Sequence, residues 1–510
     1  MTTVAAARDF PHHPVERAQS MATVTHESPP PDPDAGTREG AVALVVDMDG
    51  TLVRTDTLHE SVLLIARLRP LDLLRFPFWI AHGKAAFMVR IAERATVNPH
   101  LLPLDERVVN LVASARADGR RTVLATASHH RTAQAVAERV GAFDEVMATQ
   151  GTNLSGRNKR DALVARFGAR GFDYVGNSEA DRPVWSAARR ALVVNAPPRL
   201  LRALQREHGN VQALEPRRPH PLPALLDACR LYQWVKNLLV FVPLLAAHAL
   251  DAGSAARAGA AFLCFGLAAS ASYLVNDLLD LEADRRHARK SRRAFASGSA
   301  QAGQGAVLAL ALYVAAFAGA VVLAPAFAGY LLAYVVTTTL YSLFLKRYPL
   351  LDVIVVAGLY TTRIVAGGAA TGIPVSLWLL GFSMFLFTSL AFAKRYSETS
   401  QLEARGEAAI AGRGYRAGDS AVLMALGTSA GMAAVLTLAL YVSSSTSANL
   451  YRRPELLWAL CPLLLYWIGR IWLAAQRNIL TDDPIVFAFR DRTSVLVLAL
   501  AIVPIVLATL

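Results

Sequence analysis

The sequence predicts a chain in two parts, a soluble α/β domain followed by an all-α polytopic membrane domain of about nine transmembrane helices. Its 510 residues are enough for more than one domain. Residues 1–220 have the mixed composition of a soluble protein, whereas residues 231–510 are dominated by apolar runs of about 18–22 residues, the length that crosses a bilayer. Lys and Arg cluster in the loops between these runs, so the net charge of +13 indicates membrane topology rather than nucleic-acid binding.

Before the membrane domain we expect three segments. The first 40 residues lack the apolar stretch of a signal peptide, and residues 1–40 are predicted to be a disordered, proline-rich tail. Short apolar segments alternate with helical stretches over residues 41–196, which predicts a parallel sheet with helices on both faces; these strands are expected at 41–52, 121–128, 172–178 and 189–196. Residues 197–228, amphipathic and then proline-rich, are expected to be a linker.

The membrane domain, residues 229–510, contains nine candidate spans. They lie at roughly 233–250, 258–279, 306–325, 327–345, 351–371, 375–393, 420–442, 455–475 and 493–510. Loops rich in Lys and Arg alternate with loops that are poor in them. The positive-inside rule therefore predicts a multi-pass protein of the cytoplasmic membrane, with the N-terminal domain in the cytoplasm and the C-terminus outside. The three cysteines have no spacing that indicates a disulfide framework or a metal site.

The first candidate site follows the first predicted strand, in the stretch DMDGTL. Asp47 and Asp49 come directly after this strand, and Gly50 allows a tight turn. The carboxyl ends of strands are where α/β folds bind ligands. Asp47 could attack a phosphoryl group and Asp49 could act as the acid/base, with Mg²⁺ offsetting their charge. Taken alone, the pair could also be a turn with a solvated carboxylate.

Four motifs in order resemble those of the haloacid dehalogenase superfamily of phosphatases. They are DMDGT, the threonine that ends VLAT, the lysine of GRNKRDAL and the stretch GNSEAD. The resemblance implies a Rossmann-like fold in which Asp47 is the nucleophile and Asp49 the acid/base. It further implies that Thr126 and Lys159 hold phosphate, and that Asp181 binds Mg²⁺ together with the two aspartates of the first motif.

Two features of this domain leave alternatives open. Position 177 is Asn177, where the superfamily usually has aspartate, so the domain is either a working phosphatase or a degenerate, regulatory one. The resemblance also implies a helical cap at about 56–110. Within it, the apolar stretch LDLLRFPFWIAHG at 71–83 could rest on the membrane or pack inside the cap.

The second candidate site is the stretch SYLVNDLLDLEADRRHARKSRR, residues 272–293, which leaves an apolar span. On one continuous helix, four of its side chains fall within an arc of about 80°: Asp277, Asp280, Asp284 and His287. Ionisable groups at membrane depth generally mark a functional site, and carboxylates on one face need a cation such as Mg²⁺. Lys290 and Arg293 follow, where they could neutralise phosphate oxygens. The alternative is a helix with scattered surface charges.

Residues 225–510 resemble the UbiA-type superfamily of intramembrane prenyltransferases. Asn276 and the three aspartates after it match the first aspartate-rich motif of that superfamily, but the usual second motif is replaced by AKRYSETSQLEARGE. Other stretches look like its decaprenyl-phosphate phosphoribosyltransferase branch: RLYQWVKNLLVFVPL at 230–244, KRYPLLD at 346–352, TTRIVAGG at 361–368 and DDPIVFAFRD at 482–491.

This resemblance implies that the membrane domain joins phosphoribosyl pyrophosphate to a polyprenyl phosphate, with Asp277, Asp280 and Asp284 holding Mg²⁺ on the leaving pyrophosphate. The side chains expected to bind substrate there are Arg230, Lys236, Asn237, Asn276, His287, Lys290, Arg293, Arg363, Lys394, Arg395, Tyr396 and Glu398. Lys236 has an alternative role as an anchor at the membrane interface. Arg363 needs a partner at its depth, either Asp352 on the same helix face or a substrate phosphate.

Three functions are weighed. The first is a bifunctional enzyme whose membrane domain makes polyprenyl-phosphate phosphoribose and whose α/β domain removes the 5-phosphate. The second is an aromatic prenyltransferase that uses polyprenyl diphosphate and carries a regulatory or degenerate hydrolase-like domain. The third, a transporter or lipid-binding protein, is disfavoured because we see no pair of broken helices. The expected partners are the membrane and the two substrates, and homo-oligomerisation is left open.

Overall fold

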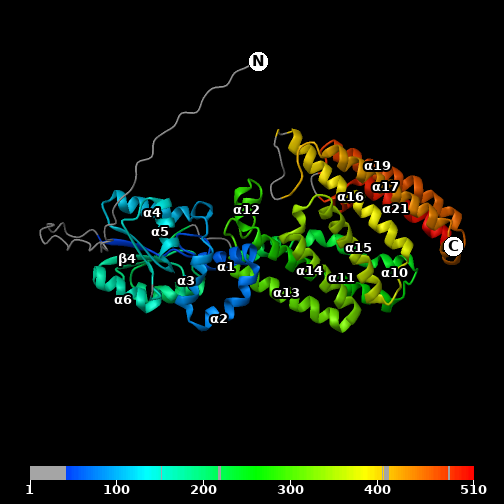
Figure 1. Ribbon diagram of the computed structural model, residues 1–510. Coiled ribbons are helices and arrows are strands. Elements are labelled where there is room, and N and C mark those ends of the chain that lie inside the picture. Colours follow the sequence, from blue (N-terminus) through cyan, green and yellow to red (C-terminus); the bar gives the residue numbers. More distant parts are fainter. Residues whose placement is uncertain (1–41, 151, 216–219, 405, 407–412, 481–482) are drawn as a thin grey trace, which may run out of the picture. The chain divides into compact units, whose positions relative to one another are not determined.

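The computed structural model describes residues 42–510, except residues 151, 216–219, 405, 407–412 and 481–482 (Figure 1). The tail expected at residues 1–40 therefore lies outside the described residues. In the described part of the chain, a β-sheet with its helices reaches to residue 213, and helices alone follow from residue 221. The predicted order of an α/β domain followed by an all-α membrane domain is confirmed.

Six parallel strands form one sheet, in the order β3-β2-β1-β4-β5-β6. The strands are β1 (Ala43–Val46), β2 (Thr122–His129), β3 (Glu145–Thr149), β4 (Phe172–Gly176), β5 (Arg190–Val193) and β6 (Val211–Ala213). β1 pairs with β2 on one side and with β4 on the other, and all of its residues are buried, as expected for a strand covered on both faces. Four strands match the predicted ones, and β3 and β6 are additional.

Helices cover both faces of this sheet. One face is covered by α4 (Glu106–Ala117) and α5 (His130–Val140). The other face is covered by α6 (Gly156–Phe167), α7 (Arg182–Ala187), which follows η3 (Glu179–Asp181), and α8 (Pro198–Glu207). Figure 1 shows α4 and α5 opposite α6 across the sheet. Successive residues of a strand point to opposite faces, so Val46 enters the core under α4 and α5, and Val45 enters the core under α6 to α8.

The expected linker at 197–228 is wrong for its first half. Three leucines of α8, Leu200, Leu201 and Leu204, are buried against the sheet, and β6 pairs with β5. The amphipathic pattern of α8 therefore reflects packing within the α/β domain. Residues 216–219 lie outside the described residues, and α9 (Pro221–Ala228) follows them.

The expected insert between the first two motifs is helical. It contains α1 (Thr57–Leu68), η1 (Pro70–Arg75), α2 (Phe76–Ala81), α3 (Lys84–Arg94) and η2 (Pro99–Leu101). Its own small core gathers Ile65 of α1, Trp79 of α2 and Ile91 of α3. The insert is therefore a packed helical unit that follows the end of β1, where the first site lies.

Eight helices in the described part of the chain are long and apolar enough to cross a membrane. They are α11 (Ala252–Leu279), α13 (Ala302–Leu323), α14 (Pro325–Leu343), α15 (Leu351–Thr371), α16 (Leu377–Ala404), α17 (Ser420–Val442), η7 (Pro454–Ala459) with α19 (Leu460–Gln476), and α21 (Arg492–Thr509). The shorter elements between them are α12 (Leu281–Arg286), η5 (Lys290–Arg292), η6 (Leu345–Arg347), α18 (Ser445–Leu450) and α20 (Pro484–Arg490). Eight of the nine predicted spans correspond to these helices.

The remaining predicted span, 233–250, is not one continuous α-helix. It consists of the 3₁₀-helix η4 (Leu231–Phe241) and the short α10 (Val242–Ala246). A 3₁₀-helix rises about 2.0 Å per residue, so η4 and α10 together extend about 30 Å, close to the thickness of a hydrocarbon core. η4 also packs tightly on α15, because a Cβ on Gly367 would lie only 2.1 Å from the carbonyl oxygen of Val240.

Candidate active sites

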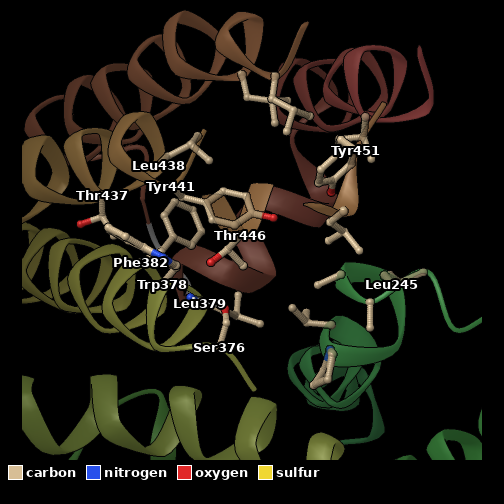
Figure 2. Close-up of a pocket in the computed structure, with 18 of the residues that line it drawn as sticks. Leu245, Ser376, Trp378, Leu379, Phe382, Thr437, Leu438, Tyr441, Thr446 and Tyr451 are labelled. Atoms are coloured by element: carbon tan, nitrogen blue, oxygen red, sulfur yellow. Dashed lines mark hydrogen bonds between the residues drawn. The ribbon is translucent and has the colours of Figure 1, made fainter. Parts of the chain in front are cut away.

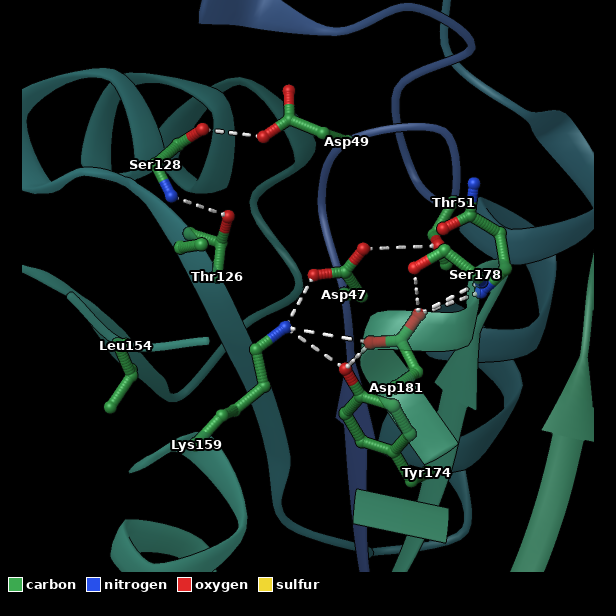
Figure 3. A network of polar contacts seen from close by, with 12 residues as sticks. Asp47, Asp49, Thr51, Thr126, Ser128, Leu154, Lys159, Tyr174, Ser178 and Asp181 are labelled. Carbon is green, nitrogen blue, oxygen red and sulfur yellow. Dashed lines mark hydrogen bonds and ion pairs between the residues drawn. The ribbon is translucent and has the colours of Figure 1, made fainter. Parts of the chain in front are cut away.

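The first site lies where the central strands of the α/β domain end, and Figure 3 shows its polar contacts. Asp47 follows β1 directly, and Nζ of Lys159 donates to its Oδ1 at 2.7 Å. Thr51 donates to its other oxygen at 3.3 Å. Both Asp47 and Lys159 are buried, so one carboxylate oxygen is fixed by a cation and the carboxylate faces a cavity of about 280 Å³.

Asp181 is joined to this pair through a tyrosine. Tyr174 of β4 donates to Oδ1 of Asp181 at 2.7 Å, and Nζ of Lys159 donates to the hydroxyl of Tyr174 at 3.0 Å. The other oxygen of Asp181 accepts from the backbone N–H groups of Asn177 and Ser178. Residues 47, 159 and 181, far apart in the sequence, therefore meet as the motif order predicts.

Asp49 is held separately from Asp47. Its Oδ1 accepts from the backbone N–H of Thr57 at 2.7 Å, and its Oδ2 accepts a short hydrogen bond from the hydroxyl of Ser128. Burial and the nearby carboxylate of Asp56 raise the pKa of Asp49 to about 7. A carboxyl group with this pKa can both donate and accept a proton near neutral pH, as a general acid/base must.

Burial also raises the pKa of Asp47 to about 6, although Lys159 opposes the shift. Burial is the largest cause of both shifts, and a cation in the cavity would favour the ionised form of both carboxylates. Asp47, Asp49 and Asp181 all line this cavity, so the donor set fits Mg²⁺, which often takes one or two carboxylates together with phosphate oxygens. Thr126 also lines it, and its hydroxyl accepts from the backbone N–H of Ser128 at 3.0 Å.

The unusual Asn177 lies against the turn after β1. Gly50 has φ of +76°, and a Cβ there would lie 2.1 Å from Nδ2 of Asn177. This turn therefore requires glycine for its conformation and for the close approach of the amide. Asn177 lines the cavity, where it offers an uncharged oxygen in place of a carboxylate.

The predicted arc assumes one continuous helix, but the helix of the acidic motif is interrupted at Asp280. Arg293 still contacts both Asp277 and Asp284. α11 ends at Leu279, Asp280 sits at the break, and α12 begins at Leu281. Asp277 and Asp284 are buried, whereas Asp280 is partly exposed. His287 is exposed beyond the end of α12, and its ring nitrogen accepts from backbone N–H groups of the following turn.

Cations compensate the three aspartates. Arg293 joins Asp277, at 3.1 Å, to Asp284, at 2.8 Å, and Arg230 donates to Asp277 at 2.5 Å. Nζ of Lys346 lies 3.2 Å from Asp280. Two predicted phosphate-binding residues, Arg230 and Arg293, are thus in contact with the acidic motif.

Among the described residues, no three His, Cys, Asp or Glu side chains converge as metal ligands. One or two carboxylates with substrate phosphates still suffice for Mg²⁺, and Asp277 and Asp284 are drawn together by one shared arginine. Asp277 and Asp284 therefore fit a Mg²⁺ ion that takes two carboxylates from the protein and its other ligands from substrate phosphates and water. Lys290, which precedes this arginine in the loop, is exposed.

A polar cavity of about 220 Å³ adjoins the acidic motif, because Tyr273 and Asn276 of α11 line it. Nζ of Lys236 lies 2.9 Å from Asp483, which also accepts from the hydroxyl of Tyr360 at 2.7 Å. Lys394 of α16 approaches the same carboxylate at 3.8 Å. Lys236 thus faces this cavity and is only about 11% exposed, which contradicts its alternative role as an interface anchor.

Arg363 lies in the wall of this cavity and is buried. It donates to Oδ1 of Asn237 at 3.0 Å and to the hydroxyl of Tyr334 at 3.1 Å, and its guanidinium stacks on aromatic rings. The amide nitrogen of Asn237 has no hydrogen-bond partner in the described structure. The suggested pairing of Arg363 with Asp352 is wrong, since Asp352 faces Arg395 instead.

Arg395 is held by two carboxylates. It contacts Asp352 at 2.6 Å and Glu398 at 2.7 Å, and the hydroxyl of Tyr415 donates to Asp352. Asp352 is completely buried, so this charge cluster is a fixed part of the wall. Tyr396, by contrast, packs on Trp472 in the apolar core, and it is not among the residues that line the cavity.

Two apolar cavities lie farther along α16 than the polar one. The nearer, about 530 Å³, is lined by Leu239, Phe387 and Trp467 among others, and Phe387 stacks on Tyr360 of the polar cavity. The farther, about 490 Å³, shares Val242, Phe382, Leu438, Leu460 and Ile505 with the nearer one. Figure 2 shows the farther cavity, where Tyr441, Tyr451 and Trp378 stand around the space.

Several residues of these sites had no place in the sequence prediction. Ser128 and Tyr174 lie within two predicted strands, and nothing in their spacing marks them. Lys346 is the first residue of KRYPLLD, and Asp483 is the second residue of DDPIVFAFRD. The resemblance singles out both stretches but assigns no role to either residue. The pairing of Asp483 with Lys236, 247 residues earlier in the chain, follows from the tertiary structure alone.

Comparisons with known proteins agree with this architecture. The model of the UbiA prenyltransferase family matches residues 238–492, and that of haloacid dehalogenase-like hydrolases matches residues 44–186. The uncharacterized protein y4nM of Sinorhizobium fredii is 37% identical over 455 residues, which cover 88% of each chain. The nodulation protein NoeC of Azorhizobium caulinodans is 35% identical over 55% of this chain and 92% of that protein.

The similarity to decaprenyl-phosphate phosphoribosyltransferase covers less. The enzyme of that name from Mycobacterium tuberculosis is 38% identical over 191 residues, which span 36% of this chain and 63% of that enzyme. The match covers more of the two rhizobial proteins, 88% and 92% of their length. The chain therefore belongs to the UbiA prenyltransferase family and joins the membrane domain of that family to an N-terminal haloacid dehalogenase-like domain.

Proposed function

We propose that the membrane domain transfers 5-phosphoribose from phosphoribosyl pyrophosphate to a polyprenyl phosphate, and that the α/β domain then removes the 5-phosphate. The observation that carries this proposal is the charge of the polar cavity. Lys236, Arg363 and Lys394 line it against one carboxylate, Asp483. Arg395 and Arg413 also line it, and both are paired with Asp352 and Glu398. Two substrates that both bear phosphate supply the negative charge that such a cavity would neutralise.

The transfer exchanges one bond at the anomeric carbon of ribose. The bond from this carbon to the pyrophosphate oxygen breaks, the pyrophosphate leaves with the electron pair, and an oxygen of the lipid phosphate forms the new bond. Asp277, Asp280 and Asp284 would hold Mg²⁺, which neutralises charge on the leaving group. Arg293, which contacts Asp277 and Asp284, and Lys290 would stabilise the charge that builds on pyrophosphate as it leaves.

The lipid phosphate would bind deeper in the cavity, at Arg363, Lys236 and Lys394. Arg363 has no carboxylate within ion-pair distance among the described residues, and the amide nitrogen of Asn237, which has no partner in the described structure, lies beside it. The polyprenyl tail would extend along α16 into the two apolar cavities. From Lys394 to Trp378 this helix rises about 24 Å, most of the hydrocarbon core.

The α/β domain would hydrolyse the phosphomonoester in two steps. An oxygen of Asp47 forms a bond to phosphorus while Asp49 gives a proton to the leaving oxygen; water then cleaves the aspartyl phosphate and returns a proton to Asp49. The contact between Lys159 and Asp47 supports this role by fixing the nucleophile. Mg²⁺ held by Asp47, Asp49 and Asp181 would neutralise phosphate charge, and Thr126 would help to hold the phosphate.

The test uses membranes that contain the full chain, Mg²⁺, polyprenyl phosphate and phosphoribosyl pyrophosphate labelled in the ribose. Extracted lipids are analysed by mass for the wild type, Asp47→Asn and Asp280→Asn. We expect labelled lipid without the 5-phosphate from the wild type, labelled lipid that keeps it from Asp47→Asn, and no labelled lipid from Asp280→Asn. The exposed carboxylates Asp118 and Glu455 supply matched controls as Asp118→Asn and Glu455→Gln.

Two results would contradict the proposal in different places. If label enters the lipid but Asp47→Asn changes nothing, the α/β domain does not act on this product. If the folded wild type labels no lipid, phosphoribosyl transfer is wrong, and the prenyl diphosphate reaction on an aromatic acceptor should be tested next. We also propose that the protein lies in the cytoplasmic membrane with its α/β domain in the cytoplasm, as the loop charges predict.

A further inference from the structure

The helical insert of the α/β domain exposes a row of large apolar side chains. Leu71, Leu74, Phe78 and Ile80 are 58–80% exposed, and Leu68 at the end of α1 is 65% exposed. On a 3₁₀-helix, residues three apart lie on one side, so Leu71 and Leu74 of η1 point in the same direction. We call these five residues the apolar edge.

The rest of the same segment is packed, so the apolar edge is not simply the outside of a loose insert. Phe76 stacks on Trp79 and meets Phe87 edge-on, and Trp79 is buried under the guanidinium of Arg94. Segment 71–83 thus divides into an inward half that forms the core of the insert and an outward half that is left bare. Packing inside the cap, one of the two alternatives that the sequence left open, therefore applies to the inward side chains. Only the outward side chains remain available for the other alternative, contact with the membrane.

We propose that the apolar edge inserts into the lipid bilayer at the level of the headgroups and upper acyl chains. A soluble domain rarely exposes this many large apolar side chains in one short segment, and short helical segments with exposed apolar side chains are typical of interfacial anchoring. Arg69 and Arg75 flank the leucines and are exposed, where they can meet anionic headgroups.

The covalent chain favours the bilayer over other occupants. Only 17 residues lie between Ala213, the last residue of the sheet, and Leu231, where η4 begins. Fully extended, they reach about 60 Å, so the α/β domain is always held near the membrane that its own helices cross. This tether gives the lipid surface a high effective concentration at the apolar edge, whereas a separate partner has to be recruited from solution.

A lipid-borne quencher can test the proposal in the full-length protein in liposomes that contain anionic lipid. The three native cysteines are buried, so a fluorophore can be attached selectively at Phe78→Cys. We expect lipids that carry the quencher about 5–10 Å below the headgroups to quench this probe, and iodide in the water to leave it bright. Ala165→Cys, on the exposed side of α6, is the matched control and should show the reverse.

A second variant keeps the readout independent of folding defects. Leu71→Glu with Leu74→Glu changes only exposed side chains, and it should abolish lipid quenching of the probe at position 78 while leaving the thermal unfolding transition unchanged. A probe at 78 that iodide quenches and lipid does not would overturn the proposal. A probe at 78 that is protected from both quenchers, and that loses this protection when the protein is diluted in the bilayer, would also overturn the proposal. In that case a second copy of the chain covers the apolar edge. Neither readout needs enzyme activity, so this result stands apart from the proposed reactions.

Discussion

The ion pair between Asp352 of α15 and Arg395 of α16 decides whether Arg395 binds substrate or holds the helices together. The sequence resemblance assigns Arg395 to phosphate, whereas the structure places its guanidinium 2.6 Å from a completely buried carboxylate. The hydroxyls of Tyr341 and Tyr415 complete the surroundings of the pair. We therefore expect Asp352→Asn to destabilise the membrane domain and not merely to weaken substrate binding.

The size of the effect follows from burial. Removing one partner of a buried ion pair leaves the other charge uncompensated and costs about 3–5 kcal/mol. For a domain of this size, the loss corresponds to a fall of the melting temperature on the order of 10 °C. Glu398, the other partner of Arg395, is about one-third exposed, so Glu398→Gln should cost only about 0–1 kcal/mol.

Thermal unfolding in detergent would be measured for Asp352→Asn, Arg395→Met, the double variant and Glu398→Gln as the matched control. We expect the double variant to lose about 1–3 kcal/mol less than the sum of the single variants, because the two residues compensate each other. Additive losses would refute the pairing. A wild-type melting temperature for Arg395→Met, together with a raised KM for the phosphate substrate, would instead restore Arg395 to substrate binding.

Three further changes test the first site and the apolar cavities. Ser128→Ala removes a hydrogen bond to Asp49 and should lower kcat for phosphomonoester hydrolysis roughly tenfold to hundredfold, as steady-state kinetics would show. Gly50→Ala forces a side chain into a left-handed turn and should cost at least about 1 kcal/mol in unfolding experiments; unchanged stability would contradict the observed turn. Phe382 lines both apolar cavities, so Phe382→Trp should raise KM for long polyprenyl phosphates more than for short ones. Leu473 is exposed and lines neither cavity, so Leu473→Trp should leave KM for both unchanged.

The first site is the part of the molecule that the sequence predicts best. In a parallel sheet, the carboxyl ends of neighbouring strands meet at one edge, so residues in or after the last part of β1, β2 and β4 must come together. Asp47, Thr126 and Asp181 line one cavity for this reason. β3 and β6 escape prediction because β3 is only half-buried and β6 has three residues, too few to show alternation.

Helical periodicity fails in the membrane domain wherever the backbone breaks or a distant helix competes. The arc that joined Asp277, Asp280 and Asp284 assumes an unbroken helix, but the chain turns at Asp280, where Lys346 of another loop binds the carboxylate. Spacing likewise places Asp352 beneath Arg363 on α15, yet Asp352 pairs across to α16. Both results depend on contacts between segments far apart in the sequence, which no local pattern contains.

The single acid of the polar cavity explains why a site without the second aspartate motif can still be stable before substrate arrives. Burial alone would raise the pKa of Asp483, but Lys236 and Lys394 hold it well below its ordinary value, so the carboxylate stays ionised at neutral pH. One negative charge therefore offsets part of the positive charge in the empty cavity and keeps both lysines in place. In the described structure Arg363 has no such carboxylate beside it and is contacted by amide, hydroxyl and aromatic groups instead. A phosphate that binds at Arg363 meets a guanidinium that forms no ion pair with a carboxylate in the described structure. A phosphate that binds at Lys236 or Lys394 must compete with Asp483. We therefore expect Arg363 to contribute more to phosphate affinity than either lysine.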